Sequence, residues 1–247
     1  MPVNIDTVYQ RVLAIANKEQ RGYITPQEFN LFANQVQIDI FEQYFYDLNQ
    51  FRRVQGSFES STDMISILED KISIFEEFDD NGVTGMGNYT SSGDGVILPN
   101  DLYRITRIDV ANVNDELRLA ERLNTNDFND VRSLGPLTSP FTDRPVYNVR
   151  QNILRIDNGG TGFVDPTAGD CFIHYIRRPV AVNWGYVVLN NKALYNANTS
   201  VNFELHASEE KELVTKILSL AGIAIEDMAL YQVAEAKDVK DINQEKM

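Results

Sequence analysis

The chain has 247 residues, with 22 Lys and Arg against 36 Asp and Glu, which gives a formal net charge of −14. Its 43% hydrophobic and 23% charged residues are typical of a folded protein with a sizeable core, and they exclude a disordered chain. Binding of nucleic acid through its phosphates requires stripes of Lys and Arg, so the acidic balance argues against that class of protein.

A single cysteine excludes an intramolecular disulfide framework and is typical of a protein made in a reducing cytosol. The first ten residues, MPVNIDTVYQ, lack the charged and apolar regions of a signal peptide. No apolar run approaches the roughly 18–20 residues of a membrane span. We therefore expect a soluble protein that is assembled in a cytoplasm without a membrane partner.

The first 55 residues predict two helices. Apolar residues recur every three or four positions from Ile5 to Ile15, which indicates a first amphipathic helix. A second helix should begin at Thr25, because an N-cap Thr precedes Pro26 at the first helical position and Glu28 at the third. Its apolar stripe is wide enough to be buried against more than one neighbour and consists of Phe29, Phe32, Val36, Ile40, Phe41, Tyr44, Phe45 and Leu48.

The middle of the chain predicts mainly strands. Residues 62–78 indicate a short helix followed by a strand, and the glycine-rich stretch from Asn81 to Gly95 indicates a loop or a flexible tip. A helical turn or two is expected within Asn126–Ser133. Further strands are expected at Val96–Leu98, Leu102–Val110, Glu116–Glu121, Val146–Val149, Ile153–Ile156 and Cys171–Ile176.

A helical pattern returns near the C-terminus. Ser208 is the expected N-cap, and acidic residues follow it in the first turn, where the helix dipole favours anions. The apolar stripe of this helix comprises Leu213, Ile217, Leu220, Ala224, Met228 and Tyr231. Beyond Ala234 the chain is mostly polar and charged, which indicates a helix that leaves the body of the protein or frays.

These elements predict an α+β fold in which an N-terminal helical hairpin and a C-terminal helix frame a β-rich antiparallel middle. Short strands joined by Gly, Asn and Pro turns favour a sandwich or a small barrel. The expected divisions are residues 1–55 for the helical part, 56–205 for the β-rich part and 206–247 for the last helix and polar tail. We expect the three parts to form one integrated domain.

The motifs that could carry chemistry are weak. Cys171 and His174 have the spacing of half a zinc site, but strand residues three apart point to opposite faces and there is no second cysteine. Residues 77–82 imitate the start of a calcium loop, yet Asn88 stands where the bidentate Glu is needed. With two histidines in the chain, a histidine-based triad is not expected. We predict no metal, no cofactor and no enzymatic activity.

Two features instead suggest interaction with other proteins. A strand ends at Arg177 and Arg178, and Trp184 and Tyr186 follow shortly after it; Trp, Tyr and Arg are the usual interface anchors. The structural alternative is a strand end closed by an aromatic plug. The second feature is the C-terminal helix and tail, which could pack on its own domain or on an identical neighbour through Met228, Tyr231, Val239 and Ile242.

Three stretches of the chain carry a resemblance to a known family. They are VYQRVLAIANKEQRGYITPQEFNLFANQVQIDIFEQYF from Val8 to Phe45, FIHYIRRPVAVNWGY from Phe172 to Tyr186, and VNFELHASEEKELVTKILSLAGIAIEDMALYQVAEAKD from Val201 to Asp238. The ILPNDLYRI stretch from Ile97 to Ile105 also looks like the strand starts of phage head–tail adaptors. Together these stretches resemble virion structural proteins of crAss-like phages, which are short-tailed viruses of gut bacteria.

The resemblance implies a subunit of the head-to-tail connector in the neck or tail of the virion. Such proteins form rings, commonly twelve-fold, that stack under the portal protein or on an adjacent ring around the DNA channel. DNA would pass through transiently without sequence readout, and carboxylates in the lumen would repel its phosphates. Two other functions stay open: a tail module that binds a receptor or glycan through the β-rich middle, and a carboxylate-based wall hydrolase packaged with the virion.

Overall fold

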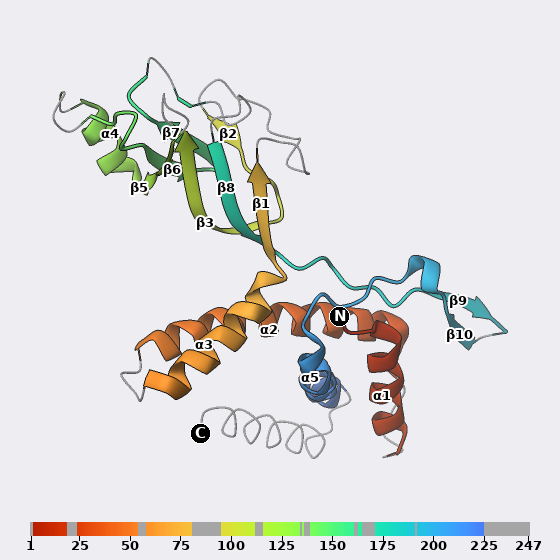
Figure 1. Cartoon of the computed structure of the whole chain (residues 1–247). Coiled ribbons are helices and arrows are strands. Elements are labelled where there is room, and N and C mark those ends of the chain that lie inside the picture. Colours follow the sequence, from red (N-terminus) through yellow and green to blue (C-terminus); the bar gives the residue numbers. More distant parts are fainter. Residues whose placement is uncertain are drawn as a thin grey trace. The chain divides into compact units, whose positions relative to one another are not determined.

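The computed structural model describes residues 2–18, 24–53, 58–80, 95–111, 116–133, 135, 139–160, 163–164, 171–190 and 192–224. The fold is α+β as predicted, with helices towards both ends and a β-rich middle (Figure 1). The chain forms two compact units, which we name the helical unit (Met1–Ile74 with Pro179–Met247) and the β unit (Phe75–Arg178). This division differs from the one expected at residues 55 and 205, because the extended segment after Arg178 belongs with the helices.

The helical unit contains the predicted helices and one element that the sequence analysis missed, a β-hairpin. Its helices are α1 (Ile5–Lys18), α2 (Pro26–Arg53), α3 (Phe58–Ser73) and α5 (Glu210–Ala224), with short 3₁₀ turns η2 (Ala197–Thr199) and η3 (Ala207–Glu209). The hairpin pairs β9 (Tyr186–Leu189) with β10 (Lys192–Tyr195).

The start of α2 is the capping box that the sequence predicted. The Thr25 N–H donates to Oε2 of Glu28 at 2.9 Å, and the Glu28 N–H donates to Oγ1 of Thr25 at 3.3 Å. Most of the predicted stripe of α2 is buried, and α5 packs against both α1 and α2. Phe32, Phe45 and Leu48 are only half-buried, and the polar side chain of Gln37 is buried.

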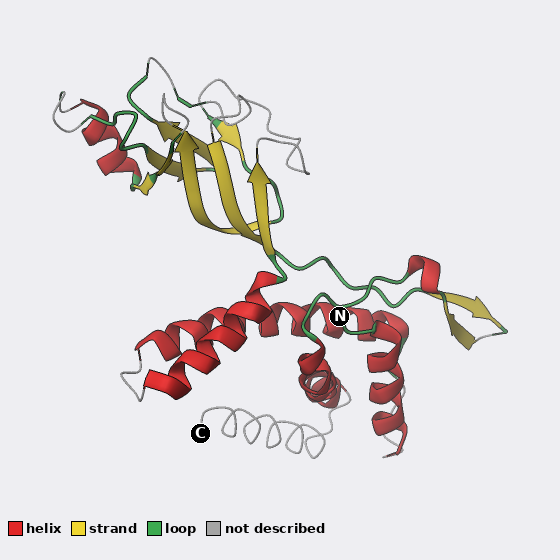
Figure 2. Ribbon diagram, in the orientation of Figure 1, coloured by secondary structure: helices red, strands yellow, loops and turns green. Residues whose placement is uncertain are grey.

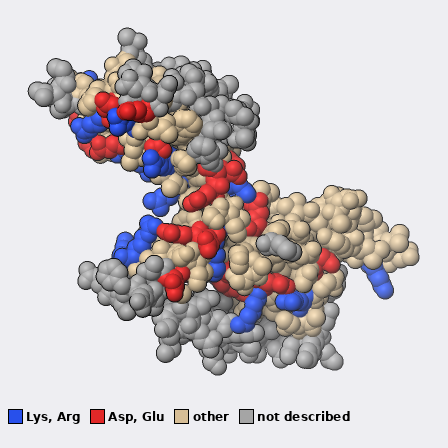
Figure 3. All heavy atoms as spheres, viewed as in Figure 1, with Lys and Arg blue, Asp and Glu red and all other residues tan. Residues whose placement is uncertain are grey.

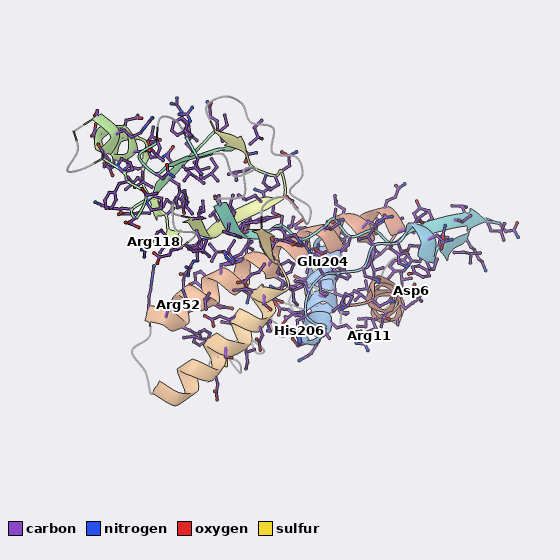
Figure 4. The ribbon with its side chains drawn as sticks, turned by 45° about the horizontal axis from the view of Figure 1, so that its top comes forward. Asp6, Arg11, Arg52, Arg118, Glu204 and His206 are labelled. Carbon is purple, nitrogen blue, oxygen red and sulfur yellow. The ribbon has the colours of Figure 1, made fainter. Side chains whose placement is uncertain are left out.

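The entry into α5 differs from the prediction. Ser208 was expected as the N-cap, but it lies inside η3, and His206 caps that turn by accepting the Ser208 N–H on its Nδ1 at 3.2 Å. The chain therefore enters α5 through a tight turn that begins two residues earlier. Figure 4 shows His206 and Glu204 on the segment that leads into α5. Leu213 and Ile217 are fully buried, as their stripe predicted.

The β unit contains two four-stranded sheets, shown as yellow arrows in Figure 2. One sheet has the order β1-β8-β3-β4 and the other the order β2-β7-β6-β5. The strands are β1 (Glu76–Asp80), β2 (Val96–Ile97), β3 (Leu102–Ala111), β4 (Leu117–Leu119), β5 (Glu121–Arg122), β6 (Val146–Arg150), β7 (Ile153–Asp157) and β8 (Cys171–Arg177), and helix α4 (Thr125–Ser133) follows β5.

Both sheets contribute to one apolar core, which is the sandwich arrangement and not a closed barrel. Ile108 and Ile173 come from the first sheet, and Leu154 and Ile156 come from the second. The predicted Glu116–Glu121 strand is split at Ala120, whose side chain turns into this core. One pair departs from the antiparallel expectation: β5 and β6 are parallel, because α4 provides the crossover that a parallel pair requires.

Candidate interaction surfaces

A row of side-chain amides on α2 binds an extended segment of the helical unit. Asn34 makes two bonds with the backbone of Val182: its Nδ2 donates to the carbonyl at 2.9 Å, and its Oδ1 accepts the N–H at 2.8 Å. One turn earlier, Asn30 accepts the Trp184 N–H at 2.7 Å, and one turn later Gln37 donates to the carbonyl of Val180 at 2.8 Å. These side-chain amides satisfy backbone N–H and C=O groups that a neighbouring strand would otherwise bind, and they hold residues 180–184 along the helix.

Trp184 closes this segment as a buried plug. Its side chain is 2% exposed, and its ring lies 4.2 Å from that of Tyr9 and 5.8 Å from those of Tyr186 and Tyr195, between ring centroids. Its Nε1 donates to Oδ1 of Asp6 at 2.9 Å, and Figure 4 labels Asp6 on α1. Of the two interpretations of Trp184, the aromatic plug is the one that describes this residue.

The plug holds the base of the β9–β10 hairpin. Tyr186 and Tyr195 form the first pair of the hairpin, and both rings contact Trp184. The Asn196 N–H donates to the carbonyl of Gly185 at 2.8 Å. A Cβ at Gly185 would lie 2.8 Å from the backbone carbon of Thr199, so only glycine fits at this point. The hairpin therefore leaves the helical unit from a fixed base.

Beyond its base the hairpin is exposed on both faces. Val187 and Val188 point to opposite faces because they are consecutive strand residues, and their side chains are 54% and 61% exposed. Leu189 and Leu194 are exposed as well. Figures 1 and 2 show the hairpin extending beyond the helices, and Figure 3 shows mostly uncharged atoms over it. We name residues 186–195 the apolar arm.

A second exposed apolar surface lies on α2. Leu31, Ile38 and Tyr46 are 68%, 49% and 67% exposed, and their spacing of seven and eight residues places them on one side of the helix. Asp39 and Glu42 are exposed on the same side. We name these five residues the outer face of α2. It combines apolar area with two carboxylates.

The predicted interface residues fall in different parts of the chain. Arg177 and Arg178 belong to the β unit, whereas Trp184 and Tyr186 belong to the helical unit. Arg177 is in an ion pair with Glu77 on β1, with 3.0 Å between Nε and Oε1, and this contact joins two neighbouring strands. The other predicted interface residues, Met228, Tyr231, Val239 and Ile242, lie outside the described residues.

The Cys171–His174 spacing does not build a metal site. Cys171 faces the core and is buried, while His174, three residues along β8, is partly exposed, as the strand geometry predicted. Among the residues that the structure describes, no three His, Cys, Asp or Glu side chains are grouped to hold a metal ion. Residues 81–88 of the calcium-loop pattern lie outside the described residues. No helix within these ranges has the length and apolarity to cross a membrane.

Two neighbouring carboxyl groups, Glu209 and Glu212, lie at the junction of η3 and α5, the first buried and the second half-buried. Glu209 accepts from Lys71 on α3 at 2.6 Å and from Ser208 at 3.0 Å, while Glu212 pairs with Lys216 at 2.8 Å. Burial raises the pKa of Glu212 to about 7, and the adjacent carboxylate of Glu209 adds to the rise. Burial acts on Glu209 in the same direction, but the hydrogen bonds from Lys71 outweigh it and lower its pKa. Glu212 therefore takes up a proton near neutral pH, whereas Glu209 stays ionised.

The comparisons with known proteins identify no relative. No protein-family model matches the chain, and no curated protein matches its sequence.

Proposed function

We propose that this protein is a structural subunit of a tailed-phage virion, one ring protein of the head-to-tail connector. The observation that supports the proposal best is the pair of exposed apolar surfaces on one unit, the apolar arm and the outer face of α2. Exposed apolar surfaces of this kind mark protein–protein contacts in a folded chain. Two different surfaces on one subunit allow head-to-tail association, which closes into a ring when the rotation fits.

The construction of the helical unit also supports a scaffold. Its long helix α2 contacts α3 and α5, and its amides hold the segment that leads to the arm. The ion pairs of this unit join its own helices: Arg52 on α2 pairs with Glu69 on α3 at 3.1 Å, and Arg11 on α1 pairs with Glu210 on α5 at 3.0 Å. Figure 4 labels both arginines. Both pairs are largely exposed and add little to stability, so the packed helices themselves form the frame that presents the arm.

The proposed partners are further copies of the chain, the portal protein and adjacent connector or tail rings. The net charge of −14 suits a ring around a DNA channel, because carboxylates repel phosphates and let DNA slide. In this proposal the protein is not an enzyme, and it is located in the neck or tail of the virion. The similarity of the three sequence stretches to crAss-like virion proteins is the reason for choosing the connector among ring-forming proteins.

The test is to express the chain together with the portal protein of the same phage and to purify the complex through a tag on the portal. Stable co-purification as a stacked ring supports the connector role. A free trimer that binds glycans would replace it with the receptor-binding function. Release of soluble fragments from peptidoglycan by the purified chain would replace it with the wall hydrolase.

A further inference from the structure

We propose that the apolar arm of one copy of the chain binds the outer face of α2 on the next copy. This inference rests on the proposed ring and names the two surfaces that form its lateral contact. Both surfaces belong to the helical unit.

The first argument is that the apolar faces of the arm are exposed and would be stabilised by a packing partner. A two-stranded hairpin is at best marginally stable in water when no third element packs on it. Both faces of this hairpin are exposed beyond Tyr186 and Tyr195, and in the described part of the chain only its base is packed, on Trp184. Because Trp184 fixes the base of the arm, binding has to order only its exposed end, which favours its use as an inserted element.

The second argument is the charge of the two surfaces. The arm carries one charged residue, Lys192, which is exposed, and it contains no acidic residue. The outer face of α2 sets Asp39 and Glu42 beside exposed Leu31, Ile38 and Tyr46. An apolar surface with one cation thus meets an apolar surface with two anions. This complementarity favours a second copy of the chain as the partner, and it opposes contact of one arm with another arm, which would bring two lysines together.

The third argument is geometric. The arm and the outer face of α2 are different surfaces, so their contact is heterologous and each subunit uses both at once. A contact between identical surfaces would stop at a dimer. An arm of about ten residues supplies only part of the 1,200–2,000 Å² that a stable interface buries, so a single contact is weak and ring closure strengthens it.

The experiment uses two charge variants of the full chain, Val188→Asp in the arm and Ile38→Asp on α2. Ser66→Asp on the exposed side of α3 is the matched control, because it adds the same charge away from the arm and from α2. Association is measured by sedimentation in about 1 M salt, where the screening length falls to about 3 Å, so that long-range repulsion between copies is suppressed while apolar contacts and ion pairs at contact distance remain. The wild type and Ser66→Asp should associate, and each of the other variants should associate about tenfold more weakly or less.

The decisive sample is an equimolar mixture of the two variants. Val188→Asp keeps an intact α2 face and Ile38→Asp keeps an intact arm, so the mixture should form dimers and nothing larger. A mixture that stays monomeric overturns the inference, as does wild-type association of either variant. A melting temperature of Val188→Asp several degrees below that of the wild type also overturns it, because the arm would then be covered within its own chain.

The same samples separate this inference from the proposed function. Rings of the wild type that also form with Val188→Asp would refute the arm contact and leave the connector role intact. Absence of self-association by the wild type in high salt and on the portal would refute both.

Discussion

Truncation of Phe41 tests whether the face of α2 that packs inside the helical unit is a true core. Phe41 is fully buried, and its ring lies 5.1 Å from that of Phe45 in an edge-on contact. Removal of a buried aromatic ring costs about 3–5 kcal/mol through lost transfer energy and the cavity that remains. Phe32→Ala should cost less than Phe41→Ala, because Phe32 is only half-buried.

Trp184 provides the assay. It is the one tryptophan of the chain and is buried in the helical unit, so its emission reports unfolding of that unit. A loss of about 4 kcal/mol at an m-value of about 2 kcal/mol/M lowers the urea midpoint by about 2 M. Leu31→Ala on the exposed side of the same helix is the control and should cost no more than about 0.5 kcal/mol. A Phe41→Ala midpoint close to that of Leu31→Ala would refute the packing argument.

The remaining predictions concern single positions. Asn34→Leu should cost about 2–3 kcal/mol in the same urea assay, because it leaves a backbone N–H and a carbonyl without partners; an unchanged midpoint would contradict the amide row. Gly185→Ala should lower the melting temperature, since its Cβ meets the backbone of Thr199, and equal melting would show that the turn can adapt. The raised pKa of Glu212, about 7 against an ordinary 4.5, means that the folded state keeps a proton that the unfolded chain has lost. Stability should therefore fall as pH rises from about 4.5 through 7 in the wild type and fall less in Glu212→Gln, as thermal melts at pH 5 and pH 8 would show; equal slopes would contradict the assignment. Deletion of Lys237–Met247 should leave the melting temperature unchanged and reduce incorporation into particles, because we expect this segment to bind an adjacent subunit; normal incorporation would rule out an assembly role.

The sequence predicted elements whose signals are local. The capping box at Thr25 and Glu28 is built from residues three apart, and it needs no information about the rest of the fold. The same holds for most strands of the β unit, whose apolar runs end at Gly, Asn and Pro turns. The sandwich was one of two predicted arrangements, and the core shared by the two sheets distinguishes it from the barrel.

The amide row of α2 could not be predicted, because its partner lies about 150 residues away. Asn30, Asn34 and Gln37 recur at helical spacing beside the apolar stripe, and that pattern alone fits a solvated face equally well. Their partner segment, residues 180–184, has no strand pattern and is extended because the amides bind its backbone. Whether Trp184 is buried depends on the same long-range contact, so the sequence alone could not distinguish a buried plug from an exposed interface residue.

The hairpin did leave a signal in the sequence. Two short and mostly apolar runs, Tyr-Val-Val-Leu and Lys-Ala-Leu-Tyr, are separated by Asn190 and Asn191. In the structure Asn190 has the positive φ that tight hairpin turns require. The nearby Trp184 instead indicated an interface anchor or an aromatic plug. The exposed end of this hairpin, not the Trp, is the surface that the structure offers to a partner.

The number of subunits in the assembled protein tests the central claim most directly. Native mass spectrometry of the chain assembled on its portal gives that number without a fitted structure. We predict a closed ring with the twelve-fold symmetry common among connectors. A trimer, or a chain that remains monomeric in the presence of the portal, would contradict the connector role.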